Sequence, residues 1–236
     1  MSGISSRNRS RSARFFGSFL RWFFRELYTS WAWSYDAVAW LSSLGGWSAW
    51  RRTALPQVPP GSPVLELGFG TGALQVEAGR RGLHLFGVDA SAQMVRLTGR
   101  RLRRAGLPLS IVQAQAQALP IPSCAVGSAF STFPSEYIFD AKTLVEIRRV
   151  LVSDGPLIVV LSARIRPRFP WEHVTRWLYD WTGQAPGPDP KWLDPFLQAG
   201  FAARFETVEV PGASVLQIIA SPSGGLRTLT PAPPPA

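Results

Sequence analysis

Three glycines follow a short apolar segment in the sequence VLELGFGTGAL, residues 64–74, which contains a single acid, Glu66. Gly68, Gly70 and Gly72 occupy alternating positions, so one side of the chain carries no side chains and a ligand can approach the backbone closely. A helix that starts after this turn offers free N–H groups to the same ligand. We therefore predict that this turn binds a ligand through its backbone, with Glu66 as a nearby charge.

Asp89 is a second acid that suits this site, because it follows the next apolar segment, residues 83–88. The carboxyl ends of parallel strands lie at one edge of a sheet, so Asp89 is expected beside the glycine turn. A carboxylate in that position accepts hydrogen bonds from the hydroxyls of a ribose. The ligand is therefore expected to contain a nucleoside.

Two classes of nucleoside ligand compete for the turn. Gly68, Gly70 and Ala73 fit the G-x-G-x-x-G/A pattern of NAD-type dinucleotides, but a glycine pattern alone is a weak signal. Glu66 favours S-adenosylmethionine (SAM), which carries an ammonium group and a sulfonium cation. A pyrophosphate at ~4 Å from this carboxylate would be repelled by ~4 kcal/mol at an effective dielectric of ~20. An oxidoreductase of the NAD type stays open as the alternative, as does a solvated Glu66 with no ligand contact.

Apolar segments alternate with amphipathic stretches and predict the elements that position these residues. Strands are expected at residues 64–67, 83–88, 109–113, 125–131, 156–162, 201–210 and 214–220. Helices are expected at residues 71–81, 91–104, 140–151 and 195–199. This order predicts an α/β fold with a doubly wound, mostly parallel seven-stranded sheet and a C-terminal antiparallel hairpin that turns at Pro211 and Gly212.

The composition limits the class of protein. With 236 residues, 46% hydrophobic and 17% charged, the chain is long and apolar enough for one domain with a core. The net charge of +10 comes almost entirely from arginine and permits anionic partners such as a membrane surface. One cysteine, Cys124, cannot form an intramolecular disulfide, so we expect a cytoplasmic protein.

Four regions are predicted along the chain. Residues 1–14 read as a disordered basic arm, with a transit peptide as the alternative, and residues 223–236 as a disordered Pro-rich tail. Residues 15–54 form an aromatic, Arg-rich amphipathic segment, which either lies in a membrane interface or packs on the domain. Residues 55–222 form the ligand-binding domain. No segment has the ~20 apolar residues of a spanning helix, so membrane contact would be peripheral.

Four segments in order, VLELGFGTG, GVDAS, AQALPIP and IRRVLVSDGPLIVV, resemble the motifs of class I SAM-dependent methyltransferases. They are most similar to the small-molecule group that includes ubiquinone and menaquinone biosynthesis enzymes. The resemblance covers residues 35–220 and implies a Rossmann-like methyltransferase fold with SAM as cofactor. It does not specify the acceptor.

The resemblance also implies a set of cofactor-binding positions. They are Tyr35, Glu66, Gly68, Phe69, Gly70, Gly72, Asp89, Ala90, Met94, Gln115, Ala116 and Thr132. Glu66 would help to hold the amino group of SAM, Asp89 would bind the ribose, and Ala90 and Met94 would flank the adenine. The family usually has Asp at the position of Gln115, whose side-chain oxygen still accepts a bond from the adenine amino group.

Methyl transfer depends mainly on alignment, and a general base is needed only if the acceptor loses a proton. Glu136, Tyr137 and His173 are the candidate catalytic residues. Trp171, Trp177, Trp181 and Trp192 form either an aromatic lid over an apolar substrate or part of the core. The expected acceptor is a small, lipophilic molecule that resembles a quinone, lipid or isoprenoid, and the expected partners are this acceptor and an anionic membrane surface.

Other functions stay open beside this reading. Nucleic acid is disfavoured as the acceptor because FPSEY, residues 133–137, lacks the N/D-P-P-Y/F pattern, but an RNA methyltransferase remains an alternative. So does a SAM-binding protein without catalysis. No metal is expected, because the sequence has no compact cluster of Asp and His. The oligomeric state is not predicted.

Overall fold

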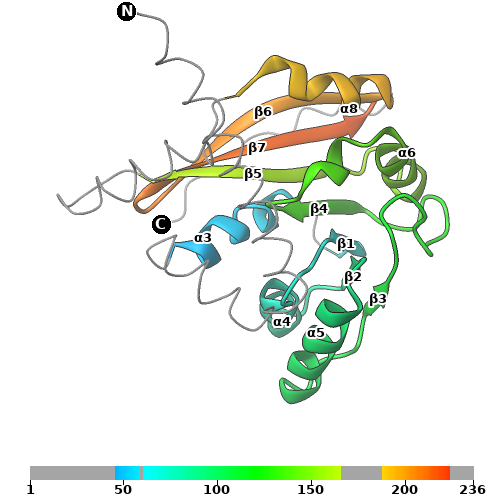
Figure 1. The fold of residues 1–236 in the computed structure, drawn as a ribbon, viewed down its shortest axis with the longest axis vertical. Helices are drawn as coiled ribbons and strands as arrows, with labels where there is room; N and C mark the ends of the chain where they lie inside the picture. The colour runs from blue at the N-terminus through cyan, green and yellow to red at the C-terminus, as the bar shows by residue number, and fades with distance from the viewer. Residues whose placement is uncertain (1–45, 59–60, 166–187, 224–236) are drawn as a thin grey trace, which may run out of the picture.

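The computed structural model describes residues 46–58, 61–165 and 188–223 (Figure 1). The predicted arm, most of the aromatic segment and nearly all of the predicted tail lie outside the described residues. Among the predicted site residues, Tyr35 and His173 lie outside them too, as do Trp171, Trp177 and Trp181.

The sheet has seven strands in the order β3-β2-β1-β4-β5-β7-β6. The strands are β1 (Val64–Leu67), β2 (Leu85–Asp89), β3 (Ile111–Gln113), β4 (Ser128–Thr132), β5 (Leu157–Ile165), β6 (Phe201–Val210) and β7 (Ala213–Pro222). β1 to β5 pair in parallel, whereas β7 pairs antiparallel with both β5 and β6. The predicted fold class is therefore confirmed, including the hairpin at the C-terminal end.

Helices cover both faces of this sheet. The α-helices are α3 (Trp47–Arg52), α4 (Ala73–Arg80), α5 (Ala92–Arg104), α6 (Ala141–Val150) and α8 (Asp194–Gln198), and the 3₁₀ turns are η1 (Leu55–Gln57), η2 (Glu136–Phe139) and η3 (Pro190–Leu193). Figure 1 shows α3 and α4 away from α6 and α8, with α5 at the far end beside β3. Both faces of the sheet are covered because the buried residues of β1 divide between two cores. Leu65 and Leu67 belong to the core beneath α6 and α8, and Val64 belongs to the core beneath α3 and α4.

Local signals in the sequence set where several helices begin and end. The Ser91 hydroxyl accepts a hydrogen bond from the N–H of Met94 and caps α5. Asp140 caps α6 by accepting from the N–H of Thr143. Gly212 has φ +81°, which a tight turn between β6 and β7 requires. These short-range interactions fix the elements whose ends approach the predicted site.

The described end of the aromatic segment and the start of the predicted ligand-binding domain pack together. Ala54 and Leu55 are buried in the same core as Trp50, and η1 follows directly. The described end of the aromatic segment therefore packs on the domain. Within the described ranges, none of the helices has the length and hydropathy needed to cross a bilayer.

Candidate cofactor site

A cavity of about 560 Å³ lies at the carboxyl ends of β1, β2 and β4, beside the glycine turn. Its lining residues are Leu67, Gly68, Gly70, Val88, Asp89, Ala90, Ser91, Met94, Ala114, Gln115, Ala116, Gln117, Thr132, Phe133, Pro134, Ser135 and Tyr137. This volume accommodates a ligand of the size of a nucleoside with a short side chain. The strand order places the cavity where the chain turns from the β1–β3 half of the sheet to the β4–β7 half, which is the usual ligand position in such folds.

Asp89 is held in place at the end of β2 by two backbone groups. Its Oδ2 accepts a hydrogen bond of 2.8 Å from the N–H of Gly70, and its Oδ1 accepts one of 2.8 Å from the N–H of Ser91. Burial raises the pKa of Asp89, although these two hydrogen bonds act in the opposite direction. Each carboxylate oxygen retains a lone pair, so the side chain is oriented to accept further bonds from a diol in the cavity.

The glycine turn needs its glycines for different reasons. Gly70 has φ +54° and an added Cβ would meet nothing within 4 Å, so this position stays open to a ligand. At Gly68 an added Cβ would lie 2.7 Å from the Tyr137 hydroxyl, and at Gly72 it would collide with Cγ2 of Thr98. Gly68 therefore provides room for Tyr137, and Gly72 allows α5 to pack against the turn.

Glu66 lies beneath the turn and does not line the cavity. Its side chain is 2% exposed and its Oε2 accepts a hydrogen bond of 2.7 Å from Nε2 of Gln75 on α4. Burial raises the pKa of Glu66 to about 7, against the opposing effects of the Gln75 bond and the charge of Arg51. Gly87 on β2 makes room for this pair, because an added Cβ would lie 2.6 Å from Nε2 of Gln75.

Residues 114–117 form the side of the cavity that faces the end of β3. This loop is held from outside by α6, where Arg149 donates to the carbonyls of Leu119 and Ile121. Glu146 pairs with Arg149 and accepts from the N–H of Leu119, and these contacts keep the pKa of Glu146 below its usual range. The loop thus has a fixed position that depends on two charged residues away from the cavity.

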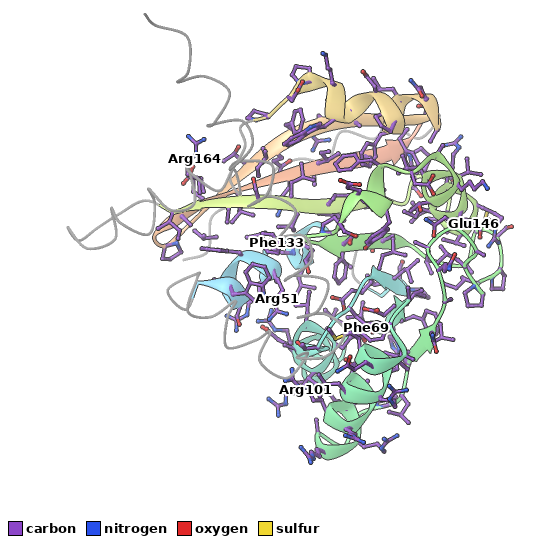
Figure 2. All side chains as sticks on the ribbon, in the orientation of Figure 1. Arg51, Phe69, Arg101, Phe133, Glu146 and Arg164 are labelled. Carbon is purple, nitrogen blue, oxygen red and sulfur yellow. The ribbon has the colours of Figure 1, made fainter. Side chains whose placement is uncertain are left out.

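The opposite side of the cavity is built by the segment that follows β4. Phe133 has φ +51°, an unusual conformation for a bulky residue, and its ring stacks on Trp47 of α3 at a centroid distance of 4.3 Å. Figure 2 shows Phe133 between the end of β4 and α3. The Tyr137 hydroxyl donates to the carbonyl of Leu67 at 3.1 Å and lies 2.8 Å from the Ser131 hydroxyl. Phe133 and the fixed hydroxyl-bearing side chain of Tyr137 therefore line the cavity from this side.

Comparison with known families identifies the part of the chain that builds this cavity. Residues 64–155 match the profile of a family described as "Methyltransferase domain". This part of the chain thus resembles the class I SAM-dependent methyltransferases. This confirms the resemblance drawn from the four sequence motifs.

Several curated relatives of this domain are named for demethylmenaquinone or for ubiquinone/menaquinone biosynthesis. A demethylmenaquinone methyltransferase from Thermus thermophilus is 32% identical over 131 residues, which cover 53% of this chain and 60% of the relative. The ubiquinone/menaquinone biosynthesis C-methyltransferase UbiE from Xanthomonas campestris is 36% identical over 139 residues, or 55% of this chain and 54% of the relative. The chain therefore spans little more than half the length of these relatives.

Solved structures support the fold of the methyltransferase domain. A geranyl diphosphate C-methyltransferase from Streptomyces coelicolor, solved with S-adenosyl-L-homocysteine, has a TM-score of 0.55 at 15% identity. The match covers 74% of this chain and 79% of that structure. At this identity the similarity shows the Rossmann-like methyltransferase fold alone.

Most of the predicted cofactor residues in the described ranges meet at the cavity of the methyltransferase domain. Those that line it are Gly68, Gly70, Asp89, Ala90, Met94, Gln115, Ala116 and Thr132. Glu66, Phe69 and Gly72 lie behind the turn instead, and Phe69 packs against Met94. Of the catalytic candidates, Tyr137 lines the cavity whereas Glu136 is exposed and does not.

Sequence reasoning did not single out several residues that shape the site. Gln75, Thr98 and Arg101 support the glycine turn, since Thr98 donates to the carbonyl of Gly70 and Arg101 to that of Thr71. Phe133 lies just before the catalytic candidates Glu136 and Tyr137, but its backbone conformation and its contact with Trp47 have no local sequence signal. Trp192 packs against Phe139 and Phe205 and does not line the cavity.

Proposed function

We propose that this protein transfers a methyl group from SAM to a small lipophilic acceptor in the cavity described above. The observation that carries the proposal is the position of Asp89, fixed by Gly70 and Ser91 at the mouth of a cavity within a methyltransferase domain. When bound, SAM supplies a methyl group on a cationic sulfur that is already a good leaving group. The chain has to hold the nucleoside, align the acceptor and exclude water.

The residues around the cavity fit such a cofactor. The open position at Gly70 admits a close approach to the backbone, and Asp89 is oriented to accept from the ribose hydroxyls. Met94 and residues 114–117 offer an apolar surface and amide groups for the adenine. Glu66 would act from beneath the turn, through its charge when ionised, because it does not reach the cavity surface.

For the acceptor we propose a flat or branched apolar molecule of the quinone, lipid or isoprenoid kind. The presence of Phe133 and Tyr137 among the lining residues supports this, because aromatic residues contact apolar and flat groups well. The relatives named for demethylmenaquinone and ubiquinone/menaquinone biosynthesis support a quinone-like acceptor in particular. Such an acceptor resides in membranes, so we propose that the protein works at a membrane surface.

Tyr137 is the catalytic candidate that we retain. Its hydroxyl lies at the cavity beside the end of β1, and its hydrogen bonds to Leu67 and Ser131 fix its direction. If the acceptor is a phenol or enol, the Tyr137 oxygen is placed to accept a hydrogen bond from the acceptor O–H, and the proton then passes to solvent water. His173 lies outside the described residues, and its role stays a prediction.

Binding and transfer test the proposal separately. Calorimetric titration of the full chain with SAM, S-adenosylhomocysteine and NAD should show heat for the first two only. The variant Asp89→Ala should bind SAM at least about tenfold more weakly, since it loses two charged hydrogen bonds to the ribose. Asp154→Ala, at a turn away from the cavity, is the matched control. Binding of NAD without binding of SAM would contradict the proposal.

The second experiment addresses the acceptor. SAM labelled on its methyl carbon is incubated with the full chain and a total lipid extract, and the products are separated by chromatography. Label in a quinone-containing fraction supports the proposed class, and Tyr137→Phe tests whether the hydroxyl contributes to the rate. Tight SAM binding with no transfer into any lipid fraction would contradict the acceptor and favour a protein that only binds SAM.

A further inference from the structure

Arginine is unevenly distributed over the described residues. Residues 46–110, which include α3, α4 and α5, contain nine arginines and three acids. Residues 111–165 and 188–223 contain six basic and eight acidic residues. The charge of the described residues is therefore concentrated on one end of the molecule, although both parts share one sheet.

The outer face of α5 carries most of this excess. Four exposed arginines, Arg96, Arg100, Arg103 and Arg104, are spaced i, i+4, i+7 and i+8, and thus lie on one side of the helix. Arg80 at the end of α4 is exposed as well. Figure 2 shows nitrogen-tipped side chains that project outward from this end of the molecule. We call these five residues the arginine face.

The acids of the same region do not neutralise the arginine face. Glu77 pairs with Arg52 and Arg81, Glu66 is buried and Asp89 lies in the cavity. Within the described ranges, none of the five residues of the arginine face has an acidic partner. Like charges at i and i+4 each cost about 0.2–0.5 kcal/mol in a helix, so the isolated chain gains nothing from this arrangement.

The helix dipole explains only part of the pattern. Basic residues in the last turn of α5 interact favourably with its C-terminal end, which accounts for Arg103 and Arg104. Arg96 lies in the second turn, where the dipole gives no such benefit, and Arg100 lies mid-helix. An external anion would stabilise these two, because guanidinium groups bind phosphate oxygens in pairs.

We propose that the arginine face binds the phosphate groups of an anionic lipid bilayer. Single-stranded nucleic acid would need aromatic side chains for base stacking, and neither α4 nor α5 contains one. Leu109 follows the end of α5 with 51% of its surface exposed, which suits the apolar layer below the headgroups. The inference concerns a surface and holds whichever cofactor the cavity binds.

The orientation is compatible with a lipophilic acceptor. Ser91 and Met94 at the N-terminal end of α5 line the cavity. A bilayer along the outer face of this helix therefore lies beside the cavity and not behind the opposite edge of the sheet. The bilayer would thus hold a lipophilic acceptor close to the residues that are proposed to align it.

Two variants of the full chain with equal net charge test the proposal. In the first, Arg96, Arg100, Arg103 and Arg104 are replaced by Gln, which keeps the helix propensity. In the matched control, Lys142, Arg164, Lys191 and Arg204 are replaced by Gln, and these lie outside the arginine face. Residues 1–45 are unchanged in both, so their arginines contribute equally.

Binding is measured by co-sedimentation with vesicles of phosphatidylcholine that contain about one third phosphatidylglycerol, at an ionic strength of about 0.1 M. We expect the first variant to lose at least about tenfold in partition coefficient, and the control less than about twofold. Vesicles of phosphatidylcholine alone should bind neither. If the fourfold variant unfolds, as judged by circular dichroism, the pair Arg96→Gln and Arg100→Gln replaces it, with about half of the logarithmic loss expected.

Three outcomes would overturn the proposal. Unchanged binding of the arginine-face variant would show that these residues do not contact the bilayer. Equal losses in both variants would show that only the net charge matters. Tighter binding of the wild-type chain to single-stranded RNA than to the anionic vesicles, with loss in the same variant, would assign the surface to nucleic acid.

Discussion

Phe133 shows how a single residue can combine backbone strain with a position at the site. Its φ of +51° lies in the left-handed region, where a side chain with a Cβ costs about 1–2 kcal/mol. The ring contact with Trp47 and the hydrogen bond from its N–H to the carbonyl of Val160 hold this conformation. Strained residues of this kind occur often at ligand sites, which fits its place in the cavity wall.

The strained backbone at Phe133 should reverse the usual order of stability of an alanine and a glycine variant. Phe133→Ala and Phe133→Gly both remove the ring, but only glycine accepts the left-handed conformation without cost. We therefore expect Phe133→Gly to be about 1 kcal/mol more stable than Phe133→Ala, although glycine is normally the less stable of the two. Urea unfolding of both variants measures the difference. An alanine variant that is as stable as the glycine variant would argue against strain at this position.

Glu66 makes the stability of the protein depend on pH. Its pKa is about 7 in the folded chain, against 4.5 for the unconstrained group, because it is buried. Between these two values the folded state binds more protons than the unfolded state, so the free energy of unfolding falls as pH rises. The stability that the protein gains while Glu66 is protonated is fully present below about pH 4.5, and it is lost once the pH has passed about 7.

Replacing this acid by its amide removes the effect. We expect Glu66→Gln to raise the free energy of unfolding at pH 8 by about 1–3 kcal/mol, and to change it little at pH 5. Thermal unfolding at the two pH values measures this. Glu77→Gln is the control, because Glu77 pairs with two arginines at the surface and gains nothing from neutralisation. A gain of equal size at both pH values would contradict the explanation.

The same variant examines the role of Glu66 in ligand binding. If the ionised carboxylate helps to hold the cation of SAM, wild-type affinity for SAM should rise with pH through about 7, and Glu66→Gln should lose that rise. Titration calorimetry at pH 6 and pH 8 measures both proteins. If the affinity for SAM depends on pH equally in the wild-type chain and in Glu66→Gln, Glu66 does not act on the cation of SAM and only holds Gln75 and the glycine turn in place.

At the scale of elements, the loop after β3 depends on α6. Arg149 connects this helix to the carbonyls of Leu119 and Ile121, and Glu146 fixes the N–H of Leu119. We expect Arg149→Met to weaken SAM binding by about five- to tenfold, because residues 114–117 lose their fixed position at a cost of about 1 kcal/mol. Titration calorimetry at constant pH measures the loss.

The neighbouring Arg148 provides a matched control for this variant. Its guanidinium donates to the carbonyl of Gly200 at 2.7 Å, on the side of α6 that faces α8. Arg148→Met should reduce stability without changing the affinity for SAM. Equal losses of affinity in both variants would mean that α6 acts through its general stability and not through the loop.

The elements with strong local signals could be predicted from the sequence. β1 and β6 were predicted to the residue, and the caps at Ser91 and Asp140 were predicted correctly. Three strands, β2, β3 and β4, are shorter than predicted because pairing, and not propensity, sets their ends. β3 begins at Ile111, whose partner is Gly87, and β4 begins at Ser128, after a single bridge between Val126 and Leu151.

The site could be predicted where a residue faces the ligand from the end of a strand, as Asp89 does. The site could not be predicted where it depends on contacts between residues that are far apart in the sequence. Gln75 reaches Glu66 only because Gly87 on another strand leaves room for both. The strain of Phe133 likewise arises from a contact with Trp47, more than eighty residues away along the chain. Such contacts require the fold before they can be seen.

At the scale of the whole molecule, α3 is part of the domain and not an appendage. Trp50 is 3% exposed and belongs to the same core as Val64, Phe130 and Ile158, which come from β1, β4 and β5. Beyond the helix, the hydroxyl of Thr53 accepts a hydrogen bond of 2.6 Å from Nε2 of Gln217 on β7. Ala54 and Leu55, on either side of the boundary predicted after residue 54, belong to this core as well.

This integration gives a prediction for the unfolding of the full chain. Trp50→Ala should lower the free energy of unfolding by about 3–5 kcal/mol. The substitution leaves a cavity in a core to which β1, β2, β4, β5 and β7 and the helices α3 and α4 contribute. Unfolding followed by tryptophan fluorescence and by far-UV circular dichroism should still coincide in one transition. Val145→Ala, at an exposed position on α6, should change stability by less than about 0.5 kcal/mol. An unchanged stability of Trp50→Ala would contradict this prediction. It would mean that α3 folds independently of the sheet, and that the contact between Trp47 and Phe133 does not depend on the packing of Trp50.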